Sequence, residues 1–202
     1  MIILASASPR RAELLKCQGV DFEAIPSSVD ESILPGEVPQ SYVLRVAEEK
    51  AAYQASRLKT DAKKYDLVLA ADTSVICDDR ILGKPENLDD FLFMMKLLSG
   101  NTHRVLTAVA VEDCTLTESS ALSYRESFVV ETAVSFRELS ESEIQSYWDS
   151  GEPQDKAGGY GIQGLGACFI IRIEGSYTNV VGLPISETMQ LLRKRNILGY
   201  LG

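Results

Sequence analysis

The most distinctive run of chemistry-bearing residues lies near the N-terminus, at Ser6-Ala7-Ser8-Pro9-Arg10-Arg11, directly after a short apolar segment. Ser8 is a preferred helix N-cap residue and Pro9 suits the first helical position, so the run predicts the start of a helix. Arg10 and Arg11 then fall in the first turn, where the helix dipole disfavours each cation by up to about 1 kcal/mol. A bound anion would remove this conflict, because amides, dipole and guanidinium groups would all point at it. The alternative is a pair of exposed surface arginines.

A second candidate is Asp72, which follows the apolar run Leu67–Ala71. The run predicts a buried strand with Asp72 at its carboxyl end, where open α/β sheets place their ligands. A carboxylate there can hold a metal ion or accept a proton from water. An aspartate at a strand end can equally cap a turn, so both interpretations stay open.

Further charged candidates are Lys84, between Gly83 and Pro85, and the charges at Glu31 and Lys50. Lysine suits phosphate as a mobile point cation, although a lone loop lysine is more often only solvated. The sequence contains no GxxxxGK[ST] motif, which excludes P-loop chemistry. Glu31 and Lys50 lie in charge runs whose default interpretation is a solvated surface.

The segment Ala157–Gly166 holds five glycines in ten residues, which permits either close approach to a ligand or tight bends in a purely structural loop. Within it, the amide of Gln163 could read a base edge as donor and acceptor. The single histidine, His103, is expected to be structural. Without a Ser/His/Asp set, acyl transfer by a serine nucleophile is not expected.

The chain has 202 residues with 45% hydrophobic content, which fits one globular unit and allows two lobes around a cleft. Its net charge of −9 argues against general nucleic-acid binding but allows a small anion, if cations gather locally and a divalent metal helps. The four cysteines show no zinc-ligand spacing and are expected to be buried, reduced thiols. No stretch approaches the roughly 18 apolar residues of a membrane span, and the N-terminus lacks a signal-peptide pattern. These features predict a cytoplasmic protein without a membrane partner.

Apolar runs and helical periodicity alternate along the chain without a strict βαβ rhythm, which favours a mixed α/β sheet over a purely parallel one. Strands are predicted at Ile2–Ala5, Leu67–Ala71, Val105–Val111, Phe128–Phe136 and Cys168–Ile173, and helices after Ser8 and at Pro39–Leu58, Leu88–Leu98, Ser140–Gly151 and Pro184–Arg195. The polar stretch Asp113–Glu126 is expected to be a loop or hairpin tip.

Taken together, these segments resemble the Maf family of nucleotide pyrophosphatases. The matching blocks are LASASPRR, Asp30-Glu31-Ser32, Glu48-Glu49-Lys50-Ala51, Ala71-Asp72-Thr73, Gly83-Lys84-Pro85, Gly100-Asn101-Thr102-His103, Glu152–Gly166 and Val181-Gly182-Leu183-Pro184. They occur in order over nearly the whole chain, and jointly they are highly specific.

The resemblance implies a single domain over residues 1–202, with an elongated, bent, mixed α/β sheet flanked by helices as two lobes around a cleft, and a homodimer. It implies hydrolysis of a nucleoside triphosphate to monophosphate and pyrophosphate with Mg²⁺, Mn²⁺ or Co²⁺. By the matching motifs, Asp72 would be the proton acceptor and a metal ligand together with Glu31. The phosphates would be held by Ser8, Arg10, Arg11, Lys50 and Lys84, and base choice would be tuned by Arg10, Thr73 and Gln163.

The stretch from Asp155-Lys156-Ala157-Gly158 through the run Tyr160-Gly161-Ile162-Gln163-Gly164 is similar to the branch that prefers dTTP and UTP, which favours pyrimidine nucleotides, modified ones included. The 7-methyl-GTP branch lacks this run. Two rival hypotheses stay open: a non-catalytic nucleotide-binding regulator of septum formation, and a purine pyrophosphatase acting on inosine or xanthosine triphosphates.

Overall fold

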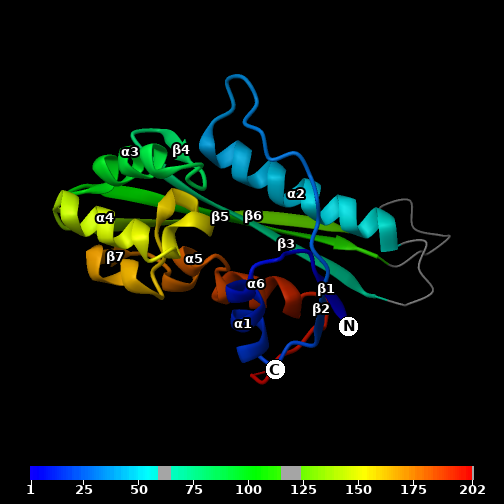
Figure 1. The fold of residues 1–202 in the computed structure, drawn as a ribbon. Coiled ribbons are helices and arrows are strands. Elements are labelled where there is room, and N and C mark those ends of the chain that lie inside the picture. Colours follow the sequence, from blue (N-terminus) through cyan, green and yellow to red (C-terminus); the bar gives the residue numbers. More distant parts are fainter. Residues whose placement is uncertain (59–64, 115–123, 202) are drawn as a thin grey trace.

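A computed structural model describes residues 1–58, 65–114 and 124–201 (Figure 1). The strands are β1 (Ile2–Leu4), β2 (Phe22–Ala24), β3 (Leu67–Cys77), β4 (Arg80–Leu82), β5 (Thr102–Asp113), β6 (Arg125–Phe136) and β7 (Ile170–Glu174). The helices are α1 (Pro9–Cys17), α2 (Pro39–Leu58), α3 (Leu88–Leu98), α4 (Glu141–Asp149), α5 (Tyr177–Val181) and α6 (Ile185–Arg193). Three 3₁₀ turns, η1 (Glu152–Asp155), η2 (Ala157–Gly159) and η3 (Leu165–Phe169), lie between α4 and β7.

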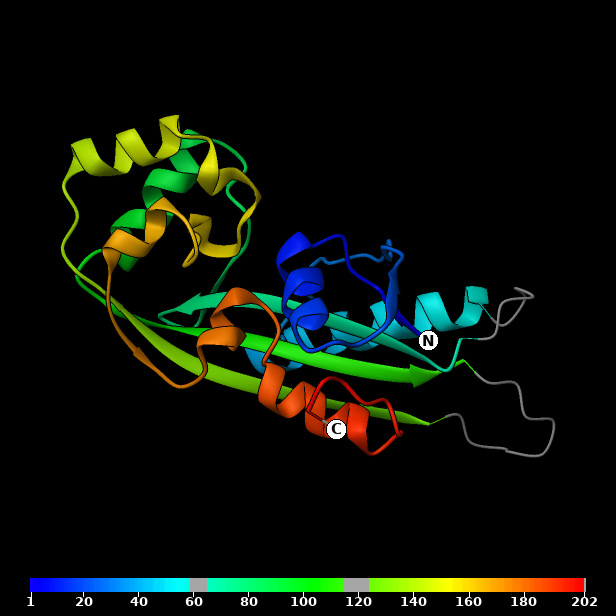
Figure 2. The same cartoon turned by 90° about the horizontal axis from the view of Figure 1, so that it is seen from below.

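The strands form one mixed sheet in the order β2-β1-β3-β5-β6-β7, with β4 added beside β3. β1 runs parallel to both β2 and β3, and every other pairing is antiparallel. The long strands β3, β5 and β6 make the sheet elongated, and they curve along their length (Figure 2). The predicted mixed α/β fold with flanking helices is confirmed.

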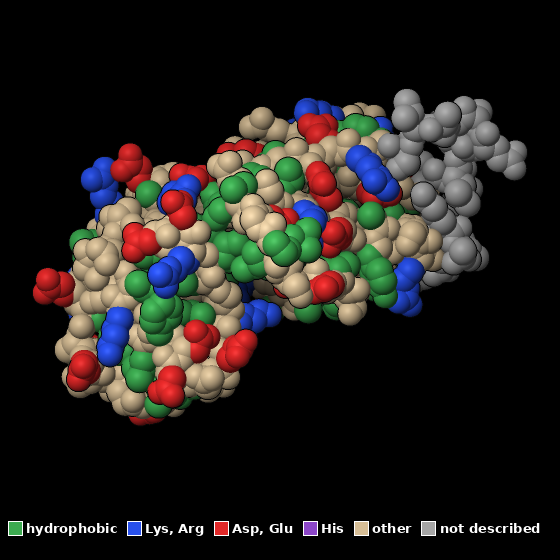
Figure 3. All heavy atoms as spheres, turned by 90° about the horizontal axis from the view of Figure 1, so that it is seen from above, with side chains coloured by type: hydrophobic (Ala, Val, Ile, Leu, Met, Phe, Trp, Pro, Cys, Tyr) green, Lys and Arg blue, Asp and Glu red, His purple; other side chains and the backbone are tan. Residues whose placement is uncertain are grey.

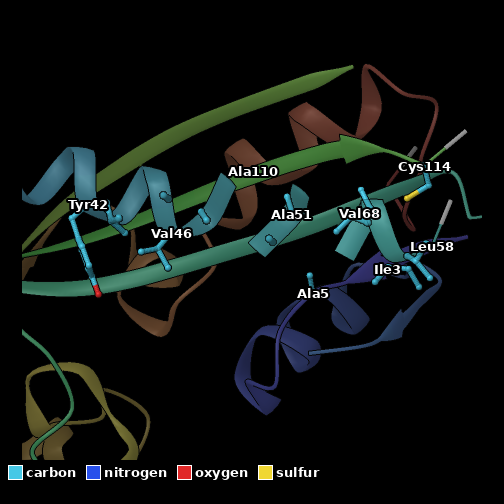
Figure 4. Packing of buried hydrophobic residues seen from close by; sticks show 14 of the residues in the cluster. Ile3, Ala5, Tyr42, Val46, Ala51, Leu58, Val68, Ala110 and Cys114 are labelled. Atoms are coloured by element: carbon cyan, nitrogen blue, oxygen red, sulfur yellow. The ribbon is translucent and has the colours of Figure 1, made fainter. Parts of the chain in front are cut away.

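The first half of β3 is buried on both faces, and its side chains alternate between two core layers. Val68 and Ala70 face α2, whose residues Val46 and Ala51 pack against them (Figure 4). Leu67, Leu69 and Ala71 face the opposite layer, which contains Leu15 of α1 and Leu191 and Leu192 of α6. Helices cover both faces, which explains why this strand reads as a continuous apolar run rather than an alternating one.

The far end of β3 belongs to a second lobe. Val75 and Cys77 pack with Phe91 and Met95 of α3, and with aromatic side chains from α4 and the 3₁₀ turns. Figure 2 shows this lobe separated from α1 along the long strands. β3 therefore spans both lobes, and its middle residues lie where the two lobes meet.

Two sequence predictions about strand ends are wrong. Asp72 does not end its strand, because β3 continues to Cys77. The parallel pairing with β1 stops at Leu69, but the antiparallel partner β5 continues the ladder to Ile76. In the predicted strand Cys168–Ile173, the first two residues belong to the turn η3, since Phe169 packs into the aromatic core of the second lobe.

The remaining predictions need only small changes. The ends of the predicted loop Asp113–Glu126 belong to β5 and β6, and residues 115–123 lie outside the described part. Cys77 and Cys114 are buried free thiols as expected, whereas Cys17 and Cys168 are exposed. Among the residues that the structure describes, no helix is both long and apolar enough to cross a membrane.

Charged side chains of both signs are interspersed over the face seen in Figure 3, without a large patch of either sign. The acidic side chains behind the net charge of −9 are therefore not gathered into one acidic patch on this face.

Candidate active site

A cleft of about 860 Å³ lies between the two lobes. Its walls contain every residue that the sequence singled out as a site candidate: Ser8, Arg10, Arg11, Glu31, Lys50, Asp72, Thr73, Lys84 and Gln163. These residues come from α1, the segment before α2, α2, β3, the loop after β4 and the loop after η2. Residues spread over 156 positions of the sequence numbering thus share one cavity.

The N-terminus of α1 opens toward this cleft as the sequence predicts. Ser8 is its N-cap, with the hydroxyl accepting a hydrogen bond from the amide of Arg11 at 3.4 Å, and Pro9 occupies the first position. No acidic residue is present in the first turn. The unsatisfied amides and the helix dipole are therefore free to attract an anion in the cleft.

Arg11 lies against the floor of the cleft and binds mainly to the protein itself. Its guanidinium donates to the carbonyl oxygens of Gly182 and Ala71, both at 2.8 Å, and to the hydroxyls of Ser6 and Thr73, at 3.1 and 2.9 Å. Burial lowers the pKa of Arg11, against the attraction of Asp72. Of the five N–H groups of arginine, four are used in this way, which leaves one for a ligand.

The partly buried Thr73 hydroxyl belongs to a chain of polar groups that continues into the core through Thr107 and Asn179. It lies 3.0 Å from the hydroxyl of Thr107, which donates to the carbonyl oxygen of Asn179 at 2.9 Å. Since Thr107 uses its proton on Asn179, Thr73 donates to Thr107 and accepts from Arg11. One lone pair of Thr73 is then left, so this hydroxyl can only accept a hydrogen bond from a ligand.

Lys50 joins the two candidate acidic residues. Its Nζ lies 2.8 Å from both Asp72 Oδ1 and Glu31 Oε1. The side chains of Lys50 and Asp72 are only 11% and 10% exposed, whereas that of Glu31 is 51% exposed. The helix periodicity explains this position, because Lys50 lies on the buried face of α2. The default interpretation of this lysine as part of a solvated surface is therefore wrong.

The segment that carries Glu31 is held by two residues of α2. The Tyr42 hydroxyl donates to the carbonyl oxygen of Glu31 at 2.9 Å. Arg45 donates to the carbonyl oxygen of Ser32 at 2.9 Å and forms a two-bond ion pair with Glu37 at 2.6 and 2.8 Å. The hydrogen bond from Arg45 lowers the pKa of Glu37 to about 2. These contacts keep Glu31 beside Lys50 although its side chain is half exposed.

Arg10 and Lys84 differ from the other cations of the cleft. Within the described part of the chain, neither side chain makes a hydrogen bond or an ion pair. The backbone beside Lys84 is fixed, because the Gly83 carbonyl oxygen accepts a hydrogen bond from the amide of Gly158 at 2.8 Å. Both cations therefore line the cleft with their charges available to an anionic ligand.

The glycine-rich segment forms the wall opposite α1, and its glycines make room for protein atoms. A Cβ on Gly158 would lie 2.8 Å from Val75, and one on Gly159 would lie 2.9 Å from Phe91. Both glycines have positive φ angles, 67° and 68°. The tight-bend interpretation therefore accounts for these two glycines. Gln163, in contrast, is exposed at the cleft.

His103 takes no part in lining the cleft. It is 1% exposed, its Nε2 lies 2.7 Å from the Tyr160 hydroxyl, and its ring packs edge-on against Phe136. Burial lowers the pKa of His103 to about 4. A neutral, buried imidazole is a structural group here, as expected, and not a base for chemistry in the cleft.

Sequence reasoning missed Lys156, which also lines the cleft. Its Nζ donates to the carbonyl oxygen of Glu152 and to Asp155 Oδ1, both at 2.6 Å. Lys156 lies within the matching block Glu152–Gly166, directly before the glycine-rich segment, but no role was predicted for it. With it, the lining contains five cations and four carboxylates, so the cleft carries one net positive charge in a chain of net charge −9.

The donor atoms of the cleft suit a hard divalent cation that enters with its ligand. In the described ranges, no group of three or more His, Cys, Asp or Glu side chains is arranged to hold a metal ion. Glu31 and Asp72 each contact Lys50 Nζ through one oxygen, and their other carboxylate oxygens make no hydrogen bond with the described residues, which leaves these oxygens for a cation. Mg²⁺ commonly binds through one or two carboxylates together with water and substrate phosphates. The residues present fit such a cation.

Comparison with known proteins agrees with the resemblance seen in the sequence. A dTTP/UTP pyrophosphatase of Pseudoalteromonas atlantica is 49% identical over 199 residues, covering 98% of both chains. A protein of the same name from Syntrophomonas wolfei is 48% identical over 197 residues, covering 96% of this chain and 98% of the relative. Another, from Pseudoalteromonas translucida, is 52% identical over 192 residues, covering 95% of both chains. The family described as Maf-like protein matches residues 1–195. With this match over nearly its whole length, the chain belongs to the Maf family.

Proposed function

We propose that this protein is a nucleoside triphosphate pyrophosphatase that hydrolyses dTTP and UTP, and related modified pyrimidine nucleotides, to the monophosphate and pyrophosphate. The observation that carries the proposal is the buried Asp72–Lys50 pair in a cleft that also presents the unpaired cations Arg10 and Lys84. Relatives that match almost the whole chain and bear the name dTTP/UTP pyrophosphatase support the same activity. Such an enzyme would serve to clear nucleotide pools, with a link to the arrest of cell division.

In the proposed reaction, a water molecule attacks the α-phosphorus. A new P–O bond forms to the water, the bond between the α-phosphorus and the bridging oxygen breaks, and pyrophosphate leaves. Asp72 accepts the proton of the water, while Lys50 holds its carboxylate in place from 2.8 Å. No covalent intermediate is needed, because catalysis consists of positioning and charge stabilisation.

The cations of the cleft share the work of holding the phosphates. Arg10 and Lys84 make no hydrogen bond or ion pair in the described part of the chain and would contact the leaving pyrophosphate. Ser8 and the first amides of α1 add neutral donors. Arg11 has one N–H group left, so its main part is to fix α1 to Ala71 and Thr73, beside Asp72, with one contact to the substrate.

We further propose that a divalent cation, Mg²⁺, Mn²⁺ or Co²⁺, is bound by Glu31 and Asp72 together with the substrate phosphates. Such a cation lowers the pKa of bound water and neutralises the leaving group. A triphosphate carries about four negative charges at neutral pH. The one net positive charge of the cleft does not balance them, which is a further reason to expect a cation.

Base choice would depend on Arg10, Thr73 and Gln163. Gln163 can both donate to and accept from a base edge, whereas Thr73 can only accept, because its own proton is used on Thr107. An acceptor at this position suits a base that presents an N–H group. The ring N3–H of thymine and uracil is such a group, and cytosine lacks it.

The assembly and the compartment follow from the family resemblance and from the composition. We expect a homodimer located in the cytoplasm, with no nucleic acid or membrane as partner. The rival hypotheses are the non-catalytic regulator of septum formation and the purine pyrophosphatase. Against the regulator stands the acidic pair, since a protein that only binds nucleotide has no need to bring Glu31 and Asp72 to one lysine.

The test is pyrophosphate release from dTTP, UTP, CTP, GTP, ITP, XTP and 7-methyl-GTP, each with and without Mg²⁺ or Mn²⁺. We expect metal-dependent release, greatest with dTTP and UTP, and its near loss in Asp72→Asn with nucleotide binding still measurable. Loss of a general base typically costs about 10²- to 10⁴-fold in rate. Release led by ITP or XTP would favour the purine enzyme, and binding without any release would favour the regulator. An active Asp72→Asn enzyme would remove Asp72 from the role of base.

A further inference from the structure

The loop of residues 161–166, which carries Gln163, is bound at both ends by one pair of side chains. The Glu152 carboxylate accepts hydrogen bonds from the amides of Leu165, at 2.8 Å, and Gly166, at 3.1 Å. The Tyr147 hydroxyl accepts one from the amide of Gly161 at 3.1 Å and donates to Glu152 at 2.8 Å. Glu152 and Tyr147 thus form a single anchor for three amides of the loop.

Gln163 lies midway between the anchored amides, two residues after Gly161 and two before Leu165. It is exposed at the cleft, and its side chain makes no hydrogen bond with the described residues. In Figure 2 the chain after α4, drawn in gold, lies on the side of the second lobe that faces α1. The position of Gln163 relative to the cleft therefore depends on the two anchored ends.

The loop packs so closely on the anchor that side chains would not fit at its glycines. A Cβ on Gly164 would lie 2.3 Å from the Glu152 carboxylate, and one on Gly166 would lie 2.7 Å from the Tyr147 hydroxyl. A Cβ on Gly161 would lie 2.8 Å from Lys156 and 3.3 Å from Glu152. The glycines of the loop are thus matched to the anchor beneath them.

The anchor is itself well fixed. Tyr147 is 4% exposed, and its ring packs against Phe169 and Phe91 with centroid distances of 5.0 and 6.1 Å. Burial acts to raise the pKa of Glu152, but the hydrogen bonds from Leu165, Gly166 and Tyr147 outweigh it and keep the pKa below its ordinary value. Burial also raises the pKa of Tyr147. Near neutral pH the acceptor is thus charged and the donor protonated, so all four hydrogen bonds persist.

Glu152 also lines the cleft, where a free carboxylate would repel a phosphate ligand. Its carboxylate oxygens are directed at the two amides and the phenol instead. Its charge is thus largely compensated inside the loop. A residue of the cleft wall whose polar groups are used on the protein itself can support the neighbouring groups that are open to a ligand.

We propose that Glu152 and Tyr147 are positioning residues for base recognition, which hold the loop of residues 161–166 so that the Gln163 amide meets the pyrimidine edge. The inference rests on the proposed function, in which Gln163 reads the base. The pair sets the affinity for the base and the preference among bases. The rate of phosphate chemistry at Asp72, which comes from a different element, depends on it much less.

The experiment compares Tyr147→Phe, which removes only the hydroxyl, and Glu152→Gln, which removes only the charge, with the wild type. Glu174→Gln is the matched control, because that carboxylate is 71% exposed on β7 and does not line the cleft. The first readout is amide hydrogen exchange in the free protein. Exchange is expected to accelerate at Gly161 in Tyr147→Phe and at Leu165 and Gly166 in Glu152→Gln, and to stay unchanged in the control.

The second readout is the split between KM and kcat for dTTP, together with the preference for dTTP over dCTP. In both variants KM is expected to rise and the preference to fall, each by about tenfold, which is the effect of losing about one charge-assisted hydrogen bond. The kcat value is expected to change by less than about threefold, since the rate of the chemical step does not depend on uniform binding. In a Gln163→Ala background, Glu152→Gln is expected to cause no further loss of preference.

The outcomes separate the inference from the proposed function. Faster exchange with an unchanged preference for dTTP would overturn the positioning role, and so would a loss confined to kcat. A wild type that releases pyrophosphate without preference, or a Gln163→Ala variant that keeps the preference, would overturn the base-reading role of Gln163 and this inference with it. Unchanged exchange in both variants would show that the anchor does not hold the loop.

Discussion

The ion pair between Lys50 and Asp72 should dominate the electrostatic stability of the cleft. Lys50→Met removes the only cation within 2.8 Å of Asp72 Oδ1 among the described residues, and it keeps an unbranched side chain on the buried face of α2. Asp72 remains with a side chain only 10% exposed, whereas the second partner, Glu31, is 51% exposed. The two ion pairs of one lysine therefore differ sharply in their access to solvent.

This difference in exposure sets the expected magnitudes. Breaking a buried pair by removing one partner typically costs about 3–5 kcal/mol, because the other charge is left uncompensated. Pairs open to solvent contribute about 0–1 kcal/mol. We therefore expect Lys50→Met to lower the free energy of unfolding by about 3–5 kcal/mol, and Glu31→Gln to change it by less than about 1 kcal/mol.

The assay is urea denaturation at pH 7 with a chelator and without nucleotide, so that neither metal nor ligand contributes. The double variant Lys50→Met/Asp72→Asn is the decisive comparison, since it removes both charges of the buried ion pair. We expect it to be more stable than Lys50→Met alone by about 2 kcal/mol or more. A cost of Lys50→Met below about 1 kcal/mol, or a double variant less stable than the single one, would refute the reasoning.

Three further outcomes can be measured. Burial lowers the pKa of His103 to about 4, so the unfolded chain takes up the proton first as the pH falls. The free energy of unfolding therefore has its full value above pH 6.5, and about 3 kcal/mol of it is lost toward pH 4. Denaturation at several pH values should show this loss between pH 6.5 and 4.5 in the wild type and a flatter profile in His103→Gln. Arg11→Ala should lower the free energy of unfolding by more than about 2 kcal/mol, since four hydrogen bonds are lost. Arg10→Ala should change the free energy of unfolding by less than about 0.5 kcal/mol and should raise KM. Equal effects of the two substitutions on stability would contradict the structure. Gly164→Ala should lower the free energy of unfolding by about 1–3 kcal/mol because its Cβ would lie 2.3 Å from a carboxylate oxygen. Gly83→Ala, whose Cβ would have nothing within 4 Å, should be neutral in the same urea denaturation assay.

The sequence predicted which residues line the cleft better than it predicted how they are positioned there. Residue types reveal the chemistry they can perform, so an anion-binding helix start, a carboxylate and a loop lysine could each be proposed independently. Apolar periodicity located α2 and α3 correctly, because helices that cover a sheet must present a buried stripe. The position of Asp72 within β3 was missed, since the polar residues Asp72, Thr73 and Ser74 end the apolar run although the antiparallel ladder continues past them.

Arg10 and Arg11 show what a linear pattern cannot distinguish. The two are adjacent and identical in type, yet neighbouring helix positions point about 100° apart. One guanidinium consequently meets four protein acceptors and the other meets the open cleft. The glycine-rich segment has the same limitation, because a glycine signals that something lies close, but only the fold shows whether that neighbour is a ligand or the protein.

The arrangement of charge in the cleft accounts for the coexistence of an acidic protein with an anionic substrate. Four carboxylates in the cavity would exclude a triphosphate if they acted alone, and two of them, Asp72 and Glu31, share the single positive charge of Lys50. A third, Glu152, is turned into the loop that carries Gln163, and the fourth, Asp155, pairs with Lys156. Arg10 and Lys84 are the two cations of the cleft that make no hydrogen bond or ion pair with the described residues, and the cleft as a whole keeps one net positive charge. The same pairing that stabilises the cleft thus also selects which cations are left for the phosphates.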